Sequence, residues 1–246
     1  MKKWIWLLIV FLAAFAGYYG YHEYWPSREE ARFNPSGEPV VYMEGKNMEI
    51  SAPYLIQNHH ILVSMELGEA LSNIHLHWDE DEAIMVVSTY DHVYRLKPDE
   101  TFYMMNGRFM DLDVPMMLWG SLPYLPMEFL APLTELNWIF LESENALILD
   151  EERQCRIWAE VIAETAVMRH NPTIKSPRLP RALSPGERLM VYEIYEKWIK
   201  VRTNSGVIGF VPKSVVKRYE ECQPVSDSVS DLSTAWHPDS GKIHLP

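Results

Sequence analysis

The sequence repeats itself, and this repeat limits the folds open to the first half of the chain. Residues 40–71 align with residues 102–133 at a constant shift of 62, without a gap. The identical pairs include Met43/Met105, Gly45/Gly107, Met48/Met110, Pro53/Pro115, Met65/Met127, Glu66/Glu128 and Leu71/Leu133. So many matches at one fixed offset indicate two copies of a single structural unit.

Both copies predict the same order of elements. In each, a short strand reaches a glycine-containing turn, Glu44-Gly45 or Asn106-Gly107, and such pairs favour hairpins because they accept positive φ. A second strand runs to the proline, another hairpin follows, and a short helix begins near Ser64 or Pro126. Two closing strands then flank an acidic turn. We therefore predict a two-copy α+β domain over residues 39–152.

The second copy carries a family resemblance. Its segments Asn106-Gly107-Arg108, Leu112-Asp113-Val114-Pro115, Leu125-Pro126-Met127-Glu128-Phe129 and Ala146-Leu147-Ile148 resemble the copper amine oxidase N-terminal-like (stalk) domain of secreted Gram-positive proteins. The first copy departs from the pattern, because Val63-Ser64-Met65-Glu66 replaces the usual Val-Pro-Leu-Arg type of segment. The resemblance implies a non-catalytic appendage, with no copper and no amine oxidation.

A second, smaller unit is expected over residues 160–218. Arg188–Ile194 and Trp198–Arg202 alternate apolar and polar residues, and a glycine-containing turn follows, a pattern typical of a small all-β barrel. The segments Pro185-Gly186-Glu187 and Gly209-Phe210-Val211-Pro212 resemble a bacterial SH3 (SH3b) domain. The family's usual Gly-Trp is Gly209-Phe210 here.

The SH3b resemblance implies a ligand site. Such domains often bind peptidoglycan peptides in a groove lined by aromatic residues, and the candidates in this chain are Tyr192, Tyr195, Trp198 and Phe210. A competing interpretation places Trp198 and Phe210 in the core of the barrel. Tyr192 and Tyr195 are then the residues left for the groove.

The two cysteines, Cys155 and Cys222, flank the predicted barrel. The ends of a small domain often lie close together, so an exported chain could join them in a disulfide. The alternative is two unpaired thiols. Two cysteines exclude a disulfide-dense scaffold and a four-cysteine zinc site.

An apolar segment opens the chain. Two lysines precede Trp4–Tyr21, a run of 18 residues without a charge, which is long enough to cross a bilayer as a helix. The positive-inside rule then places the N-terminus in the cytoplasm and everything after the segment outside the cell membrane. We predict a signal anchor over 1–25 and a spacer over 26–38. A cleaved signal peptide is the alternative, because Ala14-Phe15-Ala16 has the small-x-small form of a cleavage site.

Composition and missing motifs narrow the class of function. A net charge of −12 argues against nucleic acid and against an anionic lipid surface as partners. The sequence lacks a P-loop, a Rossmann fingerprint, a nucleophile elbow and a His-Glu-x-x-His segment, so we expect no enzyme activity and no cofactor. The histidines His59, His60, His75 and His77 show no third ligand at a fixed spacing, so no metal site is expected.

These observations predict a non-catalytic, membrane-tethered, extracytoplasmic protein that binds or scaffolds the cell envelope, with peptidoglycan as its ligand. An alternative is the truncated N-terminal targeting half of a family-18 glycoside hydrolase. Residues 219–246 have the composition of a linker or tail, and Gly241–Leu245 resembles the first barrel strand of that family. A spacer that assembles with protein partners and binds no wall is a third possibility.

Overall fold

The computed structural model describes residues 10–15, 17, 18, 20, 25–153 and 155–222. Within the predicted anchor, residues 10–15, 17, 18 and 20 are helical and Trp25 is not. Among the described residues no helix has both the length and the apolar character needed to cross a membrane. The rest of the predicted anchor, and the predicted tail beyond Cys222, lie outside the described residues.

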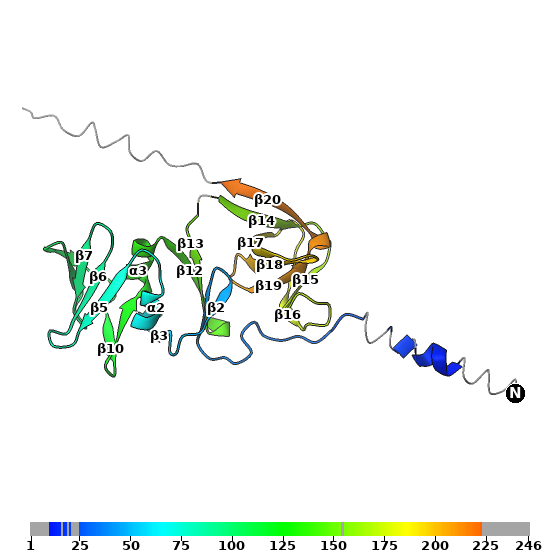
Figure 1. The fold of residues 1–246 in the computed structure, drawn as a ribbon, viewed down its shortest axis with the longest axis horizontal. Helices are drawn as coiled ribbons and strands as arrows, with labels where there is room; N and C mark the ends of the chain where they lie inside the picture. The colour runs from blue at the N-terminus through cyan, green and yellow to red at the C-terminus, as the bar shows by residue number, and fades with distance from the viewer. Residues whose placement is uncertain (1–9, 16, 19, 21–24, 154, 223–246) are drawn as a thin grey trace, which may run out of the picture.

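The first domain consists of short strands and two short helices (Figure 1). In chain order these are β1 (Val40–Met43), β2 (Lys46–Met48), β3 (Tyr54–Gln57), β4 (His60–Ser64), α2 (Met65–Glu69), β5 (His75–Asp79), β6 (Ile84–Ser88), β7 (Val93–Leu96), β8 (Phe102–Met105), β9 (Arg108–Asp111), β10 (Met117–Trp119), β11 (Leu122–Pro126), α3 (Met127–Thr134), β12 (Leu136–Leu141) and β13 (Ala146–Glu151). The hairpins and helix starts expected from the sequence are present: Ser64 caps α2, and Pro126 precedes α3.

The two copies are related by a local two-fold axis. The antiparallel strands β4 and β11 pair Val63 with Leu125, residues that correspond at the shift of 62. The flanking pairs, Tyr124 with Ser64 and Pro126 with Leu62, are symmetric about this point. The axis therefore passes through the Val63–Leu125 pair, and the central sheet has the order β10-β11-β4-β3.

The copies also exchange strands at both ends of the domain. One end sheet has the order β12-β13-β1-β2, so the opening hairpin of the first copy joins the closing hairpin of the second. There β1 runs parallel to β13, with Val40 opposite Ala146. The other end sheet, β5-β6-β7-β8-β9, joins the remaining two hairpins and inserts β7 between them. Neither copy can form its sheets alone, so the two fold as one unit.

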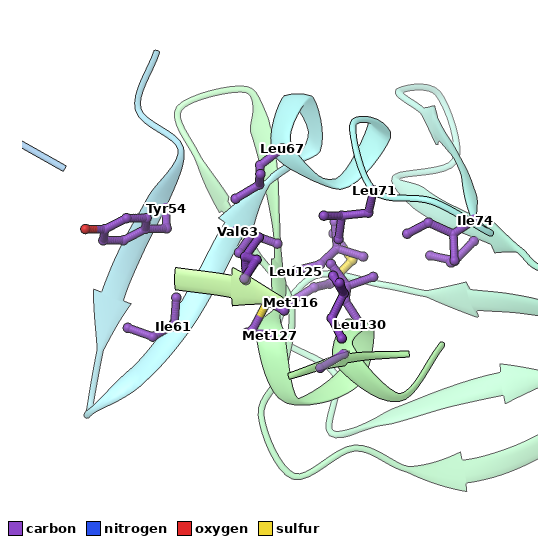
Figure 2. Close-up of a cluster of buried hydrophobic side chains, with 14 of the residues drawn as sticks. Tyr54, Ile61, Val63, Leu67, Leu71, Ile74, Met116, Leu125, Met127 and Leu130 are labelled. Atoms are coloured by element: carbon purple, nitrogen blue, oxygen red, sulfur yellow. The ribbon is translucent and has the colours of Figure 1, made fainter. Parts of the chain in front are cut away.

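A single core fills the space between these sheets. Figure 2 shows side chains from both copies meeting there, with Val63, Leu67 and Leu71 from the first and Leu125 and Leu130 from the second. All five are less than 5% exposed. Because the pair Val63 and Leu125 lies at its centre, this core joins the two copies across their axis.

The C-terminal β-domain is one seven-stranded sheet of order β16-β15-β19-β18-β17-β14-β20. Its strands are β14 (Cys155–Val161), β15 (Ala166–Arg169), β16 (Arg178–Leu183), β17 (Arg188–Ile194), β18 (Trp198–Thr203), β19 (Ile208–Pro212) and β20 (Val216–Cys222). β14 and β20 pair along their whole length, from Cys155↔Cys222 to Val161↔Val216. The domain therefore extends beyond the predicted 160–218 on both sides.

The segment before β1 corrects the prediction of a spacer over 26–38. Residues 27–31 run alongside β16, where the Ala31 amide donates to the Arg178 carbonyl (2.9 Å) and the Arg178 amide donates to the Glu29 carbonyl (2.7 Å). Phe33 is 6% exposed and packs on Tyr42, with ring centroids 5.0 Å apart. This segment is a folded strap across both domains. Its proline and polar residues resemble a linker in composition only.

Candidate functional site

A buried seam joins the two domains through the sheet β12-β13-β1-β2. One face of β13 presents Leu147 and Leu149 to the core of the repeat domain. The opposite face presents Ala146 and Ile148 to the core of the C-terminal β-domain. Both faces of β13 are therefore covered, which explains its continuous apolar run where most half-buried strands alternate.

Charged groups cross the same seam. Asp150, 2% exposed, has its Oδ2 2.9 Å from Nε of Arg202. The Nε–H is not aligned for a hydrogen bond, so this contact is an ion pair; the guanidinium does donate, through Nη1, to the Thr203 carbonyl (3.1 Å). Each charge comes from a different domain, so the pair also fixes how the domains meet.

A second ion pair lies at the turn between β1 and β2. Arg156 of β14 donates to both carboxylate oxygens of Glu44, at 2.9 and 2.8 Å. Burial alone would raise the pKa of the Glu44 carboxyl, but the hydrogen bonds and charge of Arg156 outweigh burial and hold this pKa below its ordinary value. This two-point contact holds the turn against the C-terminal β-domain.

Tyr192, one of the predicted groove residues, lies inside this seam. Its hydroxyl donates to Oδ1 of Asp150 (2.6 Å), and its ring lies against Gly45. Burial and the nearby Asp150 carboxylate raise the pKa of Tyr192 well above its usual range, so the hydroxyl stays a donor. The structure therefore places Tyr192 in the contact between the domains, away from an open groove.

Replacing Gly45 by Ala tests this close approach. A Cβ at Gly45 would lie 2.4 Å from Cδ2 of Tyr192, whereas a Cβ at the equivalent Gly107 meets no atom within 4 Å. Both glycines have positive φ, so each substitution carries a backbone cost of about 1–2 kcal/mol. We expect Gly45→Ala to lower the free energy of unfolding by a further ~1–3 kcal/mol relative to Gly107→Ala, measured by urea denaturation. Equal losses for the two variants would contradict the contact.

Two of the other groove candidates lie together beside the seam. Tyr195 and Phe210 pack edge to face, with ring centroids 5.6 Å apart. Nζ of Lys200 lies 5.8 Å from the centroid of Phe210, and the Tyr195 hydroxyl donates to Glu193. Burial lowers the pKa of Lys200. Tyr195 is 38% exposed, so this cluster offers an aromatic ring with one cation and one carboxylate beside it.

The remaining candidate, Trp198, is half-buried and pairs across the sheet with Pro212. The core of the C-terminal β-domain is built mainly from aliphatic side chains of β14 to β19, among them Ile199 and Val201, which alternate with Trp198 and Lys200 along β18. Trp198 is thus not a core-filling residue of this domain, whereas Phe210, 9% exposed, is buried as the competing interpretation predicted.

The other polar candidates are also placed. Cys155 and Cys222 form a disulfide that joins the ends of β14 and β20. Within the described residues, one group of three side chains has the spacing of metal ligands, Cys155, Glu220 and Cys222, and its two sulfurs are already bonded to each other. His75 and His77 lie exposed on β5, and His60 pairs with Glu128 at 2.9 Å.

The structure defines a class of protein: a two-copy β-rich domain with exchanged strands, packed against a smaller β-domain. Residues 42–148 match the family model of the copper amine oxidase N-terminal domain. The match confirms the resemblance carried by the repeat and spans both of its copies. No curated protein matches the chain.

Several residues of this region were not identified from the sequence. Asp150 carries a signal in retrospect, because it is the first acidic residue after the apolar run of β13. Its partner Arg202 gives no comparable signal, since it lies 52 residues further on in a strand where polar residues alternate. Lys200 and Glu193 could have been proposed as neighbours of Phe210 and Tyr195 from the strand register alone.

Proposed function

We propose that this protein is a non-catalytic, extracytoplasmic envelope-binding protein whose C-terminal β-domain is of the SH3b type and binds peptidoglycan peptides. The apolar N-terminal segment would hold it at the membrane, or direct its export. The repeat domain would serve as a rigid spacer. The observation that carries the proposal is the partly exposed Tyr195, which packs on the buried Phe210 and has Lys200 and Glu193 beside it.

The chemistry of this cluster suits a short peptide. Wall peptides carry free carboxylates, the side-chain amine of a diamino acid and the methyl groups of alanine, so Lys200 and Glu193 would each have a counter-charge. The ring of Tyr195 would cover the methyl groups, because exposed aromatic side chains supply large contact area at low entropic cost. Tyr192 takes no part, since its hydroxyl and ring are engaged in the seam.

A sedimentation assay with purified peptidoglycan sacculi tests the proposal. We expect residues 25–246 to bind, and the variant Tyr195→Ala/Lys200→Ala to bind roughly tenfold more weakly, through loss of an aromatic contact and a charge pair. The control is Tyr90→Ala/Lys217→Ala, which removes a fully exposed aromatic ring and an exposed cation that are not part of the cluster. Absence of binding, or equal loss in both variants, would reject peptidoglycan as the ligand.

A further inference from the structure

The outer face of the sheet β5-β6-β7-β8-β9 is apolar and uncovered. We call it the distal face, and Figure 1 shows β5, β6 and β7 at the end of the molecule opposite the C-terminal β-domain. A depression of about 290 Å³ on this face is lined by Ile84, Arg95, Lys97, Glu100, Phe102, Met104 and Phe109. Phe109 is 67% exposed and packs edge to face on Phe102. Exposed apolar patches of this kind commonly mark interaction sites.

The internal repeat relates the distal face to the seam. At the shift of 62, Phe102 and Met104 of β8 correspond to Val40 and Tyr42 of β1. Val40 and Tyr42 pack against the core of the C-terminal β-domain. In the first copy, this face therefore forms a contact between two domains. In the second copy, the equivalent face keeps apolar side chains but no domain covers it.

The turns at the two faces show the same difference. Gly45 is covered by Tyr192 and Glu44 is held by Arg156. At the equivalent turn, nothing lies within 4 Å of the Cβ position of Gly107, and Asn106 accepts a hydrogen bond from the Val93 amide of its own sheet. The hairpin β8–β9 is thus built like β1–β2 but contacts no second domain.

Charge defines what would cover the distal face. Arg95 of β7 and Lys97, the residue that follows β7, place exposed side chains among the apolar ones. Neither forms an ion pair with any residue in the described ranges. At the seam, by contrast, Asp150 meets Arg202 across the contact. In a chain of net charge −12, an apolar face on which two cations outnumber the one carboxylate, Glu100, favours carboxylates on the partner. Two copies meeting face to face would bring four cations and only two carboxylates together, leaving an excess of positive charge in the contact.

We propose that the distal face binds an acidic peptide segment of a partner protein, with carboxylates on Arg95 and Lys97 and apolar side chains on Phe102, Met104 and Phe109. This site is separate from the Tyr195–Phe210 cluster. It does not depend on peptidoglycan binding.

Fluorescence anisotropy of the full chain with a labelled twelve-residue peptide of alternating Glu and Phe tests the site. We expect saturable binding that falls at least tenfold in Arg95→Glu/Lys97→Glu and also in Phe109→Ser, which keeps the charge. The matched control is Lys217→Glu/Arg218→Glu, which makes the same charge change on exposed residues of β20 and should bind like the original chain.

Three results would overturn the proposal. One is no saturable binding, or the same loss in the distal and control variants. A second is stronger binding of poly(glycerol phosphate) than of the peptide, which would assign the face to an anionic polymer. The third is a concentration-dependent dimer in sedimentation velocity that Arg95→Glu/Lys97→Glu abolishes, which would assign it to a second copy.

Discussion

Replacing Asp150 by Asn is expected to lower the free energy of unfolding by about 3 kcal/mol at pH 7.5, because the guanidinium of Arg202 would remain buried without a counter-charge. Asn keeps the size of the side chain and an acceptor for the Tyr192 hydroxyl. The lost free energy of unfolding therefore measures the effect of removing the negative charge. The guanidinium of arginine does not release its proton in proteins, so Arg202 would stay charged once the carboxylate is removed. Urea denaturation followed by tryptophan fluorescence measures the change.

The reverse deletion should be milder. Burial raises the pKa of Asp150, and the charge of Arg202 only partly offsets this. In Arg202→Met the carboxyl can therefore take up a proton and remain neutral, which is not open to arginine. The double variant Asp150→Asn/Arg202→Met should recover most of the stability lost in Asp150→Asn. A single Asp150→Asn variant as stable as the original chain would show that the pair contributes nothing across the seam.

Removing the disulfide is expected to have an effect of similar size. Cys155 and Cys222 are separated by 67 residues, and in the chain-entropy model a bridge across such a loop stabilises the fold by about 4 kcal/mol. The variant Cys155→Ser/Cys222→Ser should therefore unfold at lower urea concentration.

Reductant supplies the control for this variant. Dithiothreitol should shift the urea midpoint of the original chain toward that of the variant, and leave the variant unchanged. Because β14 and β20 still pair along seven residues, the fold itself should persist without the bridge. Identical urea midpoints for the oxidised chain and the variant would mean that the hydrogen-bonded pairing of β14 with β20 alone holds the two ends of the C-terminal β-domain together.

Local features of the fold could be predicted from the sequence because they depend on neighbouring residues. The turn at Asn106-Gly107 and the helix starts at Ser64 and Pro126 are set by the conformations that those residues favour. The exchange of strands could not be predicted, since β1 pairs with β13 more than 100 residues away. A sequence repeat shows that two units have the same structure, but it does not show which strands of one copy pair with strands of the other.

The candidate site was predicted in part. The SH3b resemblance named four aromatic side chains of the C-terminal β-domain, and two of them, Tyr195 and Phe210, do lie together. Tyr192 could not be separated from them, because a bulge after Val191 and the covering turn at Gly45 depend on how the two domains meet. Sequence periodicity describes a strand by itself and contains no information about what is packed over it.

The position of the disulfide has a mechanical consequence. The bridged Cα atoms are 4.0 Å apart, at the point where the chain passes from the repeat domain into β14 and where β20 ends. A pulling force applied between the repeat domain and any residue after Cys222 would run through the sulfur–sulfur bond, bypassing the 66 residues between the two cysteines. The C-terminal β-domain would then hang beside the line of tension, able to hold a ligand while the chain around it is under load.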